Sequence, residues 1–181
     1  MKQENIRKLT VMAMLVAVSV ILVSLIHFPL FPAATFLEYD PADIPILIGA
    51  FTYGPLAGLL LTIAASAIQA LTVSAQSGLY GFLMHVISTS ILCVTASVIY
   101  RFNHTRKGAA IALVCGTLAM GLGMMIANHF ITPIFMSVPT AVVDSMLLPV
   151  FLPFNLLKAG INSVITFMVY KIVSTHLIKR I

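Results

Sequence analysis

The chain has 181 residues, of which 60% are hydrophobic and only 8% are charged. A soluble domain has about a quarter of its residues charged, so this chain has too few polar residues to cover a water-exposed surface. The composition excludes an ordinary soluble domain and predicts a single all-α membrane domain over residues 1–181.

The first predicted helix is the apolar run from Thr10 to Phe28. It is longer than the hydrophobic region of a cleavable signal peptide and has no small-residue cleavage site, so we expect it to be retained as the first span. Ala13 and Ala17 are four positions apart and therefore share one face of this helix. Small residues at this spacing let another helix approach closely, although packing inside the protein explains the pattern equally well.

An acidic connection, Phe28–Asp43, follows the first helix. Asp40 and Pro41 predict the N-cap and the first helical position of a second helix, which ends at Gly54. This helix has only about 13 residues, which is short for a span at 1.5 Å per residue. A short helix beside a long loop predicts a cavity or a dip on the outer side of the membrane.

The positions of the basic residues predict which connections are cytoplasmic. Nine of the ten fall into three groups: Lys2, Arg7 and Lys8; Arg101, Arg106 and Lys107; and Lys171, Lys179 and Arg180. Basic residues accumulate on the cytoplasmic side of membrane proteins. The net charge of +5 therefore indicates membrane topology and not nucleic-acid binding.

The number of spans follows from this placement. The uncharged stretch Ile44–Tyr100 must cross the membrane an odd number of times, and breaks at Gly54-Pro55 and at residues 76–78 favour three crossings. The stretch Gly108–Tyr170 crosses twice, divided by its prolines. The prediction is six transmembrane helices with both termini cytoplasmic, in the cell membrane.

Lys158, the tenth basic residue, lies inside the last predicted helix. A charge at membrane depth is costly and usually functional. Asn155 and Asn162 lie three residues before and four after it, so the three side chains form one polar stripe. Its partner is expected to be an acceptor atom of a ligand or a carboxylate of the outer connections: Asp40, Asp43 or Asp144. The alternative is that Lys158 extends to the membrane surface and the asparagines join helices.

Other polar residues give weaker signals. Asn128 and His129 end the fifth predicted helix, where they either contribute to the same site or cap the helix. The cysteines, Cys93 and Cys115, and the histidines lack metal-site spacing, so no metal is expected. The sequence has no P-loop and no catalytic constellation. It predicts a binding protein that needs partners for transport, with a small intramembrane enzyme as the alternative.

Three segments resemble the riboflavin-specific S component, the substrate-binding subunit, of energy-coupling factor (ECF) transporters. They are FPAATFLEYDPADIPILIGAFTYGPLAGLL (Phe31–Leu60), MIANHFITPIF (Met125–Phe135) and LPFNLLKAGINS (Leu152–Ser163). The resemblance covers nearly the whole chain and implies capture of riboflavin from outside, as transported ligand and not as cofactor. Sister S components bind thiamine, folate, biotin or pantothenate, so another vitamin is the alternative ligand.

The resemblance also implies site residues and partners. The flavin would be bound by the backbone of Leu37 and by the side chains of Asn128, Asn155 and Lys158. Ala13 and Ala17 match the pattern with which S components dock the shared ECF transmembrane subunit. Two ATP-binding-cassette ATPase subunits would complete the transporter.

Overall fold

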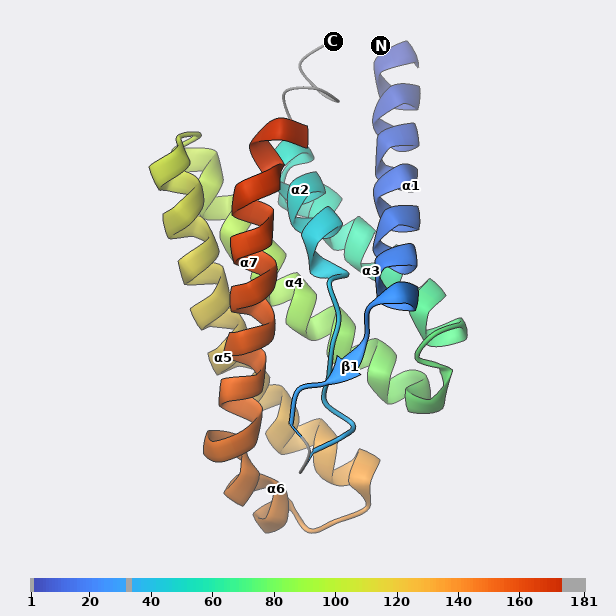
Figure 1. The fold of residues 1–181 in the computed structure, drawn as a ribbon, viewed down its shortest axis with the longest axis vertical. Coiled ribbons are helices and arrows are strands. Elements are labelled where there is room, and N and C mark those ends of the chain that lie inside the picture. Colours follow the sequence, from blue (N-terminus) through green and yellow to red (C-terminus); the bar gives the residue numbers. More distant parts are fainter. Residues whose placement is uncertain (1, 32–33, 174–181) are drawn as a thin grey trace.

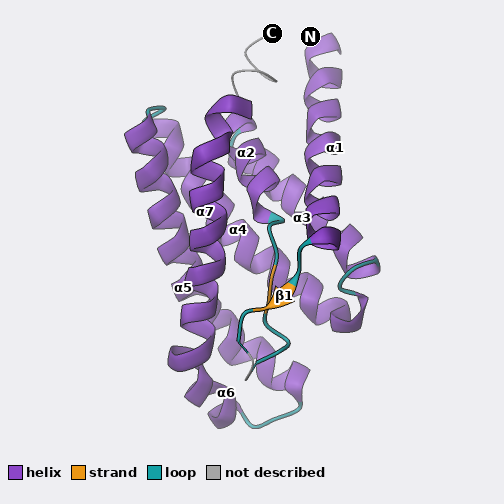
Figure 2. Ribbon diagram, in the orientation of Figure 1, coloured by secondary structure: helices purple, strands orange, loops and turns teal. Residues whose placement is uncertain are grey.

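The computed structural model of the chain describes residues 2–31 and 34–173, which fold into a helical bundle (Figure 1). Its elements are α1 (Lys2–Leu25), β1 (Phe28–Pro29), β2 (Glu38–Tyr39), α2 (Asp43–Tyr53), α3 (Pro55–Leu71), η1 (Ala75–Ser77), α4 (Gly78–Phe102), α5 (Arg106–Met136), α6 (Thr140–Met146), η2 (Leu147–Phe151) and α7 (Leu152–Val173). The two strands form a short antiparallel pair within a protein that is otherwise helices and loops (Figure 2). Lys179 and Arg180 of the third basic group lie outside the described residues.

The helices differ in length. Within the described residues, four helical segments are long and apolar enough to cross a membrane: Gln3–Leu25, Ala75–Phe102, Arg106–Met136 and Thr140–Val173. The two remaining apolar helices, α2 with 11 residues and α3 with 17, are shorter. At 1.5 Å per residue, α2 reaches only about 16 Å.

The predicted breaks between residues 44 and 100 are confirmed. Helix α2 ends at Tyr53, and α3 begins at Pro55. Gly54 between them has φ +92°, a conformation that favours glycine, and this lets the chain reverse abruptly. The second break is the turn around η1, which separates α3 from α4.

Helix α2 forms the centre of the bundle and packs against α1, α3, α4 and α7. Every residue from Asp43 to Phe51 is buried. Its close approach to α3 depends on Gly58, because a Cβ atom there would lie 2.7 Å from the Cβ atom of Ala50. The outer helices expose apolar side chains, as expected for helices that face lipid.

The segment between α5 and α7, predicted only as a proline-rich break, contains the short helix α6 and the π-helical turn η2. Helix α5 continues through Pro133 and ends at Met136, followed by Ser137 in the left-handed conformation with φ 54°. Helix α6 is short, and the π-helical turn η2 joins it directly to α7.

The start of α1, the turn between α4 and α5 and the last turn of α7 lie at one end of the bundle (Figure 1). The connection between α1 and α2, hereafter the α1–α2 loop (residues 26–42, of which 32–33 are not described), and α6 lie toward the other end. The basic residues of the described chain other than Lys158 are therefore separated from the acidic α1–α2 loop.

Candidate functional site

A cavity lies between the α1–α2 loop and helices α3, α4, α5 and α7. Its empty space, including the part open to solvent, is about 1040 Å³. Aromatic and methionine side chains form much of its wall: Phe36, Tyr80, Phe82, Met84, Met120, Met124, Phe135 and Phe154. The predicted cavity beside the short helix and the long loop is therefore present, and its lining suits a flat apolar ring.

Lys158 lines this cavity and is paired with Asp40. Its Nζ atom donates a hydrogen bond to Asp40 Oδ2 at 2.5 Å, and only 6% of the residue is exposed. The expectation that an outer-loop carboxylate neutralises Lys158 is thus confirmed, with Asp40 as the partner among the three candidates. Two of the three ammonium protons remain available for other acceptors.

The expectation that Asp40 caps α2 is wrong. Helix α2 begins at Asp43, with Ala42 at the cap position and no side-chain cap hydrogen bond. Asp40 Oδ1 instead accepts from the backbone N–H of Ala42 at 3.0 Å, while Oδ2 accepts from Lys158. Asp40 therefore stabilises the turn that precedes α2 and pairs with Lys158, and the helix begins three residues later, at Asp43.

Asn162, the third member of the polar stripe on α7, does not line the cavity. It is fully buried, and its Oδ1 atom accepts from the Tyr39 hydroxyl at 2.9 Å. Its Nδ2 atom donates to the Asp40 carbonyl at 3.0 Å and to Asp43 Oδ2 at 2.9 Å. Asn162 therefore joins α7 to the α1–α2 loop and to the start of α2.

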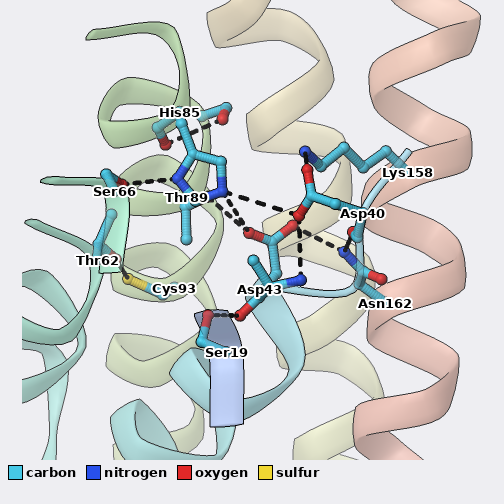
Figure 3. A network of polar contacts seen from close by, with 12 residues as sticks. Ser19, Asp40, Asp43, Thr62, Ser66, His85, Thr89, Cys93, Lys158 and Asn162 are labelled. Atoms are coloured by element: carbon cyan, nitrogen blue, oxygen red, sulfur yellow. Dashed lines mark hydrogen bonds and ion pairs between the residues drawn. The ribbon is translucent and has the colours of Figure 1, made fainter. Parts of the chain in front are cut away.

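Asp43 and His85 complete the buried polar network around this junction (Figure 3). Thr89 donates a hydrogen bond of 2.6 Å to Asp43 Oδ1. His85 Nδ1 lies 2.7 Å from Ser66 Oγ, and its Nε2 atom lies 4.0 Å from a carboxylate oxygen of Asp40 and of Asp43. The histidines were expected to be hydrogen-bonded and not metal ligands, but the roles of Ser66 and Thr89 were missed, because isolated small polar residues in apolar helices form no recognisable pattern.

The other predicted ligand residues lie on the same cavity. Asn155 Nδ2 donates to the Phe151 carbonyl at 2.8 Å, and its Oδ1 atom has no partner in the described protein. Asn128 Nδ2 donates to the Met124 carbonyl at 2.7 Å, and its Oδ1 atom accepts from Thr132 at 2.8 Å. The fold thus brings Leu37, Asn128, Asn155 and Lys158, from three separate parts of the chain, to one cavity.

His129 does not line this cavity. Its ring lies outside the cavity, and Nδ1 is 2.5 Å from Asp144 Oδ1 in an exposed pair. The described residues contain no group of three or more His, Cys, Asp or Glu side chains that could hold a metal ion.

Ala13 and Ala17 are both exposed on α1. The buried residues of this helix, Leu15, Ser19 and Val23, lie on the opposite face and point toward the rest of the bundle. The two alanines therefore leave a narrow surface on which no part of the described chain packs.

The sequence and the fold match known transporter subunits. The family model of the substrate-specific component of ECF transporters matches residues 7–170. The chain is 28% identical to the riboflavin transporter FmnP of Bacillus subtilis, over 92% of this chain and 91% of that protein. It is 27% identical to the riboflavin transporter RibU of Streptococcus thermophilus, over 97% and 86% of the two chains. It is 26% identical to the riboflavin transporter RibU of Staphylococcus aureus, over 99% of this chain and 95% of that protein.

A solved structure, described as the S component of a bacterial ECF transporter, has the same fold. The TM-score is 0.81 at 24% sequence identity, and the superposition covers 97% of this chain and 99% of that one. The family match spans almost the entire sequence, and the helices are of membrane-spanning length. The chain therefore belongs to the family of substrate-specific components of ECF transporters and is a multi-pass protein of the cell membrane.

Proposed function

We propose that this chain is the riboflavin-binding subunit of an ECF transporter, and that it takes the vitamin from outside the cell. Three relatives that align over most of their length carry the name riboflavin transporter. The observation that carries the proposal is the single cavity on which Leu37, Asn128, Asn155 and Lys158 meet.

The chemistry of the cavity suits the flavin ring. One edge of the ring has carbonyl oxygens and an N–H group, while the rest is flat and aromatic. Lys158 offers ammonium donors, and Asn155 offers a free carbonyl acceptor. The aromatic side chains of the wall can stack on or contact the ring. In this proposal the amide of Asn128 and the backbone of Leu37 complete the polar contacts.

The proposed topology has six transmembrane helices, α1 to α5 and α7, with both termini cytoplasmic. The grouping of basic residues at one end of the bundle supports this orientation, because such residues remain on the cytoplasmic side. The α1–α2 loop then covers the cavity on the outer side, where the vitamin enters.

The proposed partners are the ECF transmembrane subunit and two ATP-binding-cassette ATPase subunits. Ala13 and Ala17 would dock the transmembrane subunit, because small side chains permit close helix contact. The chain would bind and release its ligand without changing it chemically, in agreement with relatives named as transporters. Release on the inside would follow ATP hydrolysis by the partners.

Purification from cells grown with riboflavin tests the proposal. The expected product is yellow and shows the absorption spectrum of a flavin. An excess of thiamine, folate, biotin or pantothenate should not displace the flavin. A colourless protein that binds one of these vitamins instead would assign the chain to a different substrate.

A further inference from the structure

One buried amide on the cavity has no partner. Among the described residues, four buried side-chain atoms lack a hydrogen-bond partner: Gln69 Nε2, His85 Nε2, Ser90 Oγ and Thr166 Oγ1. Only Gln69 and His85 line the cavity. His85 Nε2 faces the carboxylates of Asp40 and Asp43, whereas nothing in the described chain pairs with Gln69 Nε2.

Gln69 lies on α3, one helical turn after Ser66, and only 4% of the residue is exposed. Its backbone carbonyl accepts from the N–H groups of Thr72 and Ser74, but its side-chain amide nitrogen makes no hydrogen bond in the described chain. Buried polar groups in native proteins are almost always paired. A ligand atom that accepts from Gln69 would therefore satisfy a donor that the protein leaves unpaired.

The surroundings of Gln69 indicate what kind of ligand group it contacts. Ser74 and Ser77 also line the cavity, and backbone hydrogen bonds join Ser74 to Gln69 and Ser77 to Ser74, so this part of the lining offers hydroxyl groups and an amide. Hydroxyl and amide groups both donate and accept hydrogen bonds, which matches the hydroxyl groups of a sugar alcohol. Asn155 and Lys158, the residues proposed to contact the polar edge of the ring, lie on α7, whereas Gln69 lies on α3.

The charge of the cavity favours a neutral group. Its described lining includes one Lys and no Arg, and that lysine, Lys158, is paired with Asp40. Glu38 adds a carboxylate that has no cationic partner in the described chain. A phosphate would find no free cation here.

We propose that Gln69, together with Ser74 and Ser77, forms a second polar subsite that binds an uncharged, polyhydroxylated chain of the ligand. This inference rests on the proposed function, because riboflavin consists of a flavin ring with a five-carbon chain of hydroxyl groups. Gln69 is thus a specificity-determining residue for the chain, separate from the residues proposed to bind the ring.

The test compares riboflavin with lumiflavin, which keeps the ring and has a methyl group in place of the chain. Dissociation constants are measured by quenching of flavin fluorescence with the purified chain. The wild-type protein should bind riboflavin at least about tenfold more tightly than lumiflavin, the effect of one or two hydrogen bonds. Gln69→Met, which keeps the length of the side chain, should weaken riboflavin binding about three- to tenfold and leave lumiflavin binding unchanged.

Two control variants separate the possible failures. Gln76→Met changes an exposed glutamine outside the cavity and should alter neither constant. Lys158→Ala should weaken the binding of both flavins by the same factor. The subsite proposal is wrong if Gln69→Met weakens the binding of both flavins by the same factor, or if it leaves the affinity for riboflavin unchanged.

The wild-type comparison is independent of whether the variant folds. Equal affinity of the wild-type chain for riboflavin and lumiflavin would also overturn the subsite. If the wild-type chain binds neither flavin, the proposed function itself fails.

Discussion

Lys158 and Asp40 are 118 positions apart in the sequence, and their buried ion pair joins α7 to the α1–α2 loop. The lysine lies on the wall of the cavity, and the aspartate lies on the loop that covers it. Lys158 therefore both lines the cavity and pairs with the loop.

Removing one member of this pair should destabilise the protein. Asp40→Ala leaves the buried ammonium of Lys158 without its hydrogen-bonded ion-pair partner, and breaking such a pair costs about 3–5 kcal/mol. The double variant Asp40→Leu/Lys158→Met has no buried charge at these positions and should recover most of the lost stability. Unfolding of the purified protein in detergent measures both effects. A double variant no more stable than Asp40→Ala would contradict the account.

Lys158 should also contribute directly to affinity. A hydrogen bond to a charged group is worth about 1.5–3 kcal/mol, so Lys158→Ala should weaken riboflavin binding about ten- to a hundredfold. Lys107→Ala, which changes an exposed lysine at the start of α5, is the matched control and should bind normally. An unchanged dissociation constant in Lys158→Ala would remove this lysine from the site.

Asn155 and Asn162 lie on the same helix but should behave differently. Asn162→Leu removes three hydrogen bonds and leaves Tyr39 and Asp43 without a partner on α7. It should lower the free energy of unfolding by about 2–4 kcal/mol and increase hydrogen exchange in residues 34–42. Asn155→Leu should weaken riboflavin binding and leave exchange in that segment unchanged. If Asn162→Leu weakens riboflavin binding while Asn155→Leu increases exchange in residues 34–42, Asn162 and not Asn155 contacts the ligand.

This contrast illustrates how much of the site could be predicted from the sequence. Lys158 and its two asparagines stood out because charged and amide side chains are rare in an apolar helix. The sequence placed the N-cap of α2 at Asp40 and its first helical residue at Pro41, whereas the helix begins at Asp43. A capping pattern is a local signal, whereas the pairing of Asp40 with Lys158 is determined by the tertiary fold.

The fold itself was more predictable than the site. The uncharged stretch Ile44–Tyr100 and its breaks at Gly54-Pro55 and residues 76–78 predicted α2, α3 and α4 with nearly correct bounds, because glycine and proline mark helix ends. Helix α6 and the turn η2 were missed, since prolines in this segment indicate a break without indicating its structure. The polar partners of Asp43 and His85 on α3 and α4 carry no periodic signal.

Glu38 should discriminate against phosphorylated flavins. It is exposed and lines the cavity, where its carboxylate repels a phosphate group. Flavin mononucleotide should bind more weakly than riboflavin, and Glu38→Gln should improve its binding several-fold without affecting riboflavin. Competition of the two flavins for the purified chain measures this. No change in the ratio of the two affinities would exclude a role for Glu38.

Ala13 and Ala17 provide a test that separates binding from transport. Replacing both by Leu adds bulk on an exposed face of α1 and should block a closely packed partner helix. Purified protein should still bind riboflavin, while uptake in cells and co-purification of the ECF transmembrane subunit should fall sharply. Normal uptake would mean that the partner docks elsewhere.

The proposed topology is tested with single cysteines at exposed positions. Thr35, in the α1–α2 loop, and Ser137, after α5, should react with a membrane-impermeant reagent from outside intact cells. Asn103, between α4 and α5, should not react. Labelling of Asn103 would contradict the six-helix arrangement.

Equilibrium titration of the purified wild-type chain with riboflavin tests the central claim most directly. Saturable quenching with one flavin per chain is expected, together with a large loss of affinity in the double variant Asn155→Leu/Lys158→Met. The account is contradicted if the wild-type chain does not bind riboflavin, or if the double variant binds it as tightly as the wild type does.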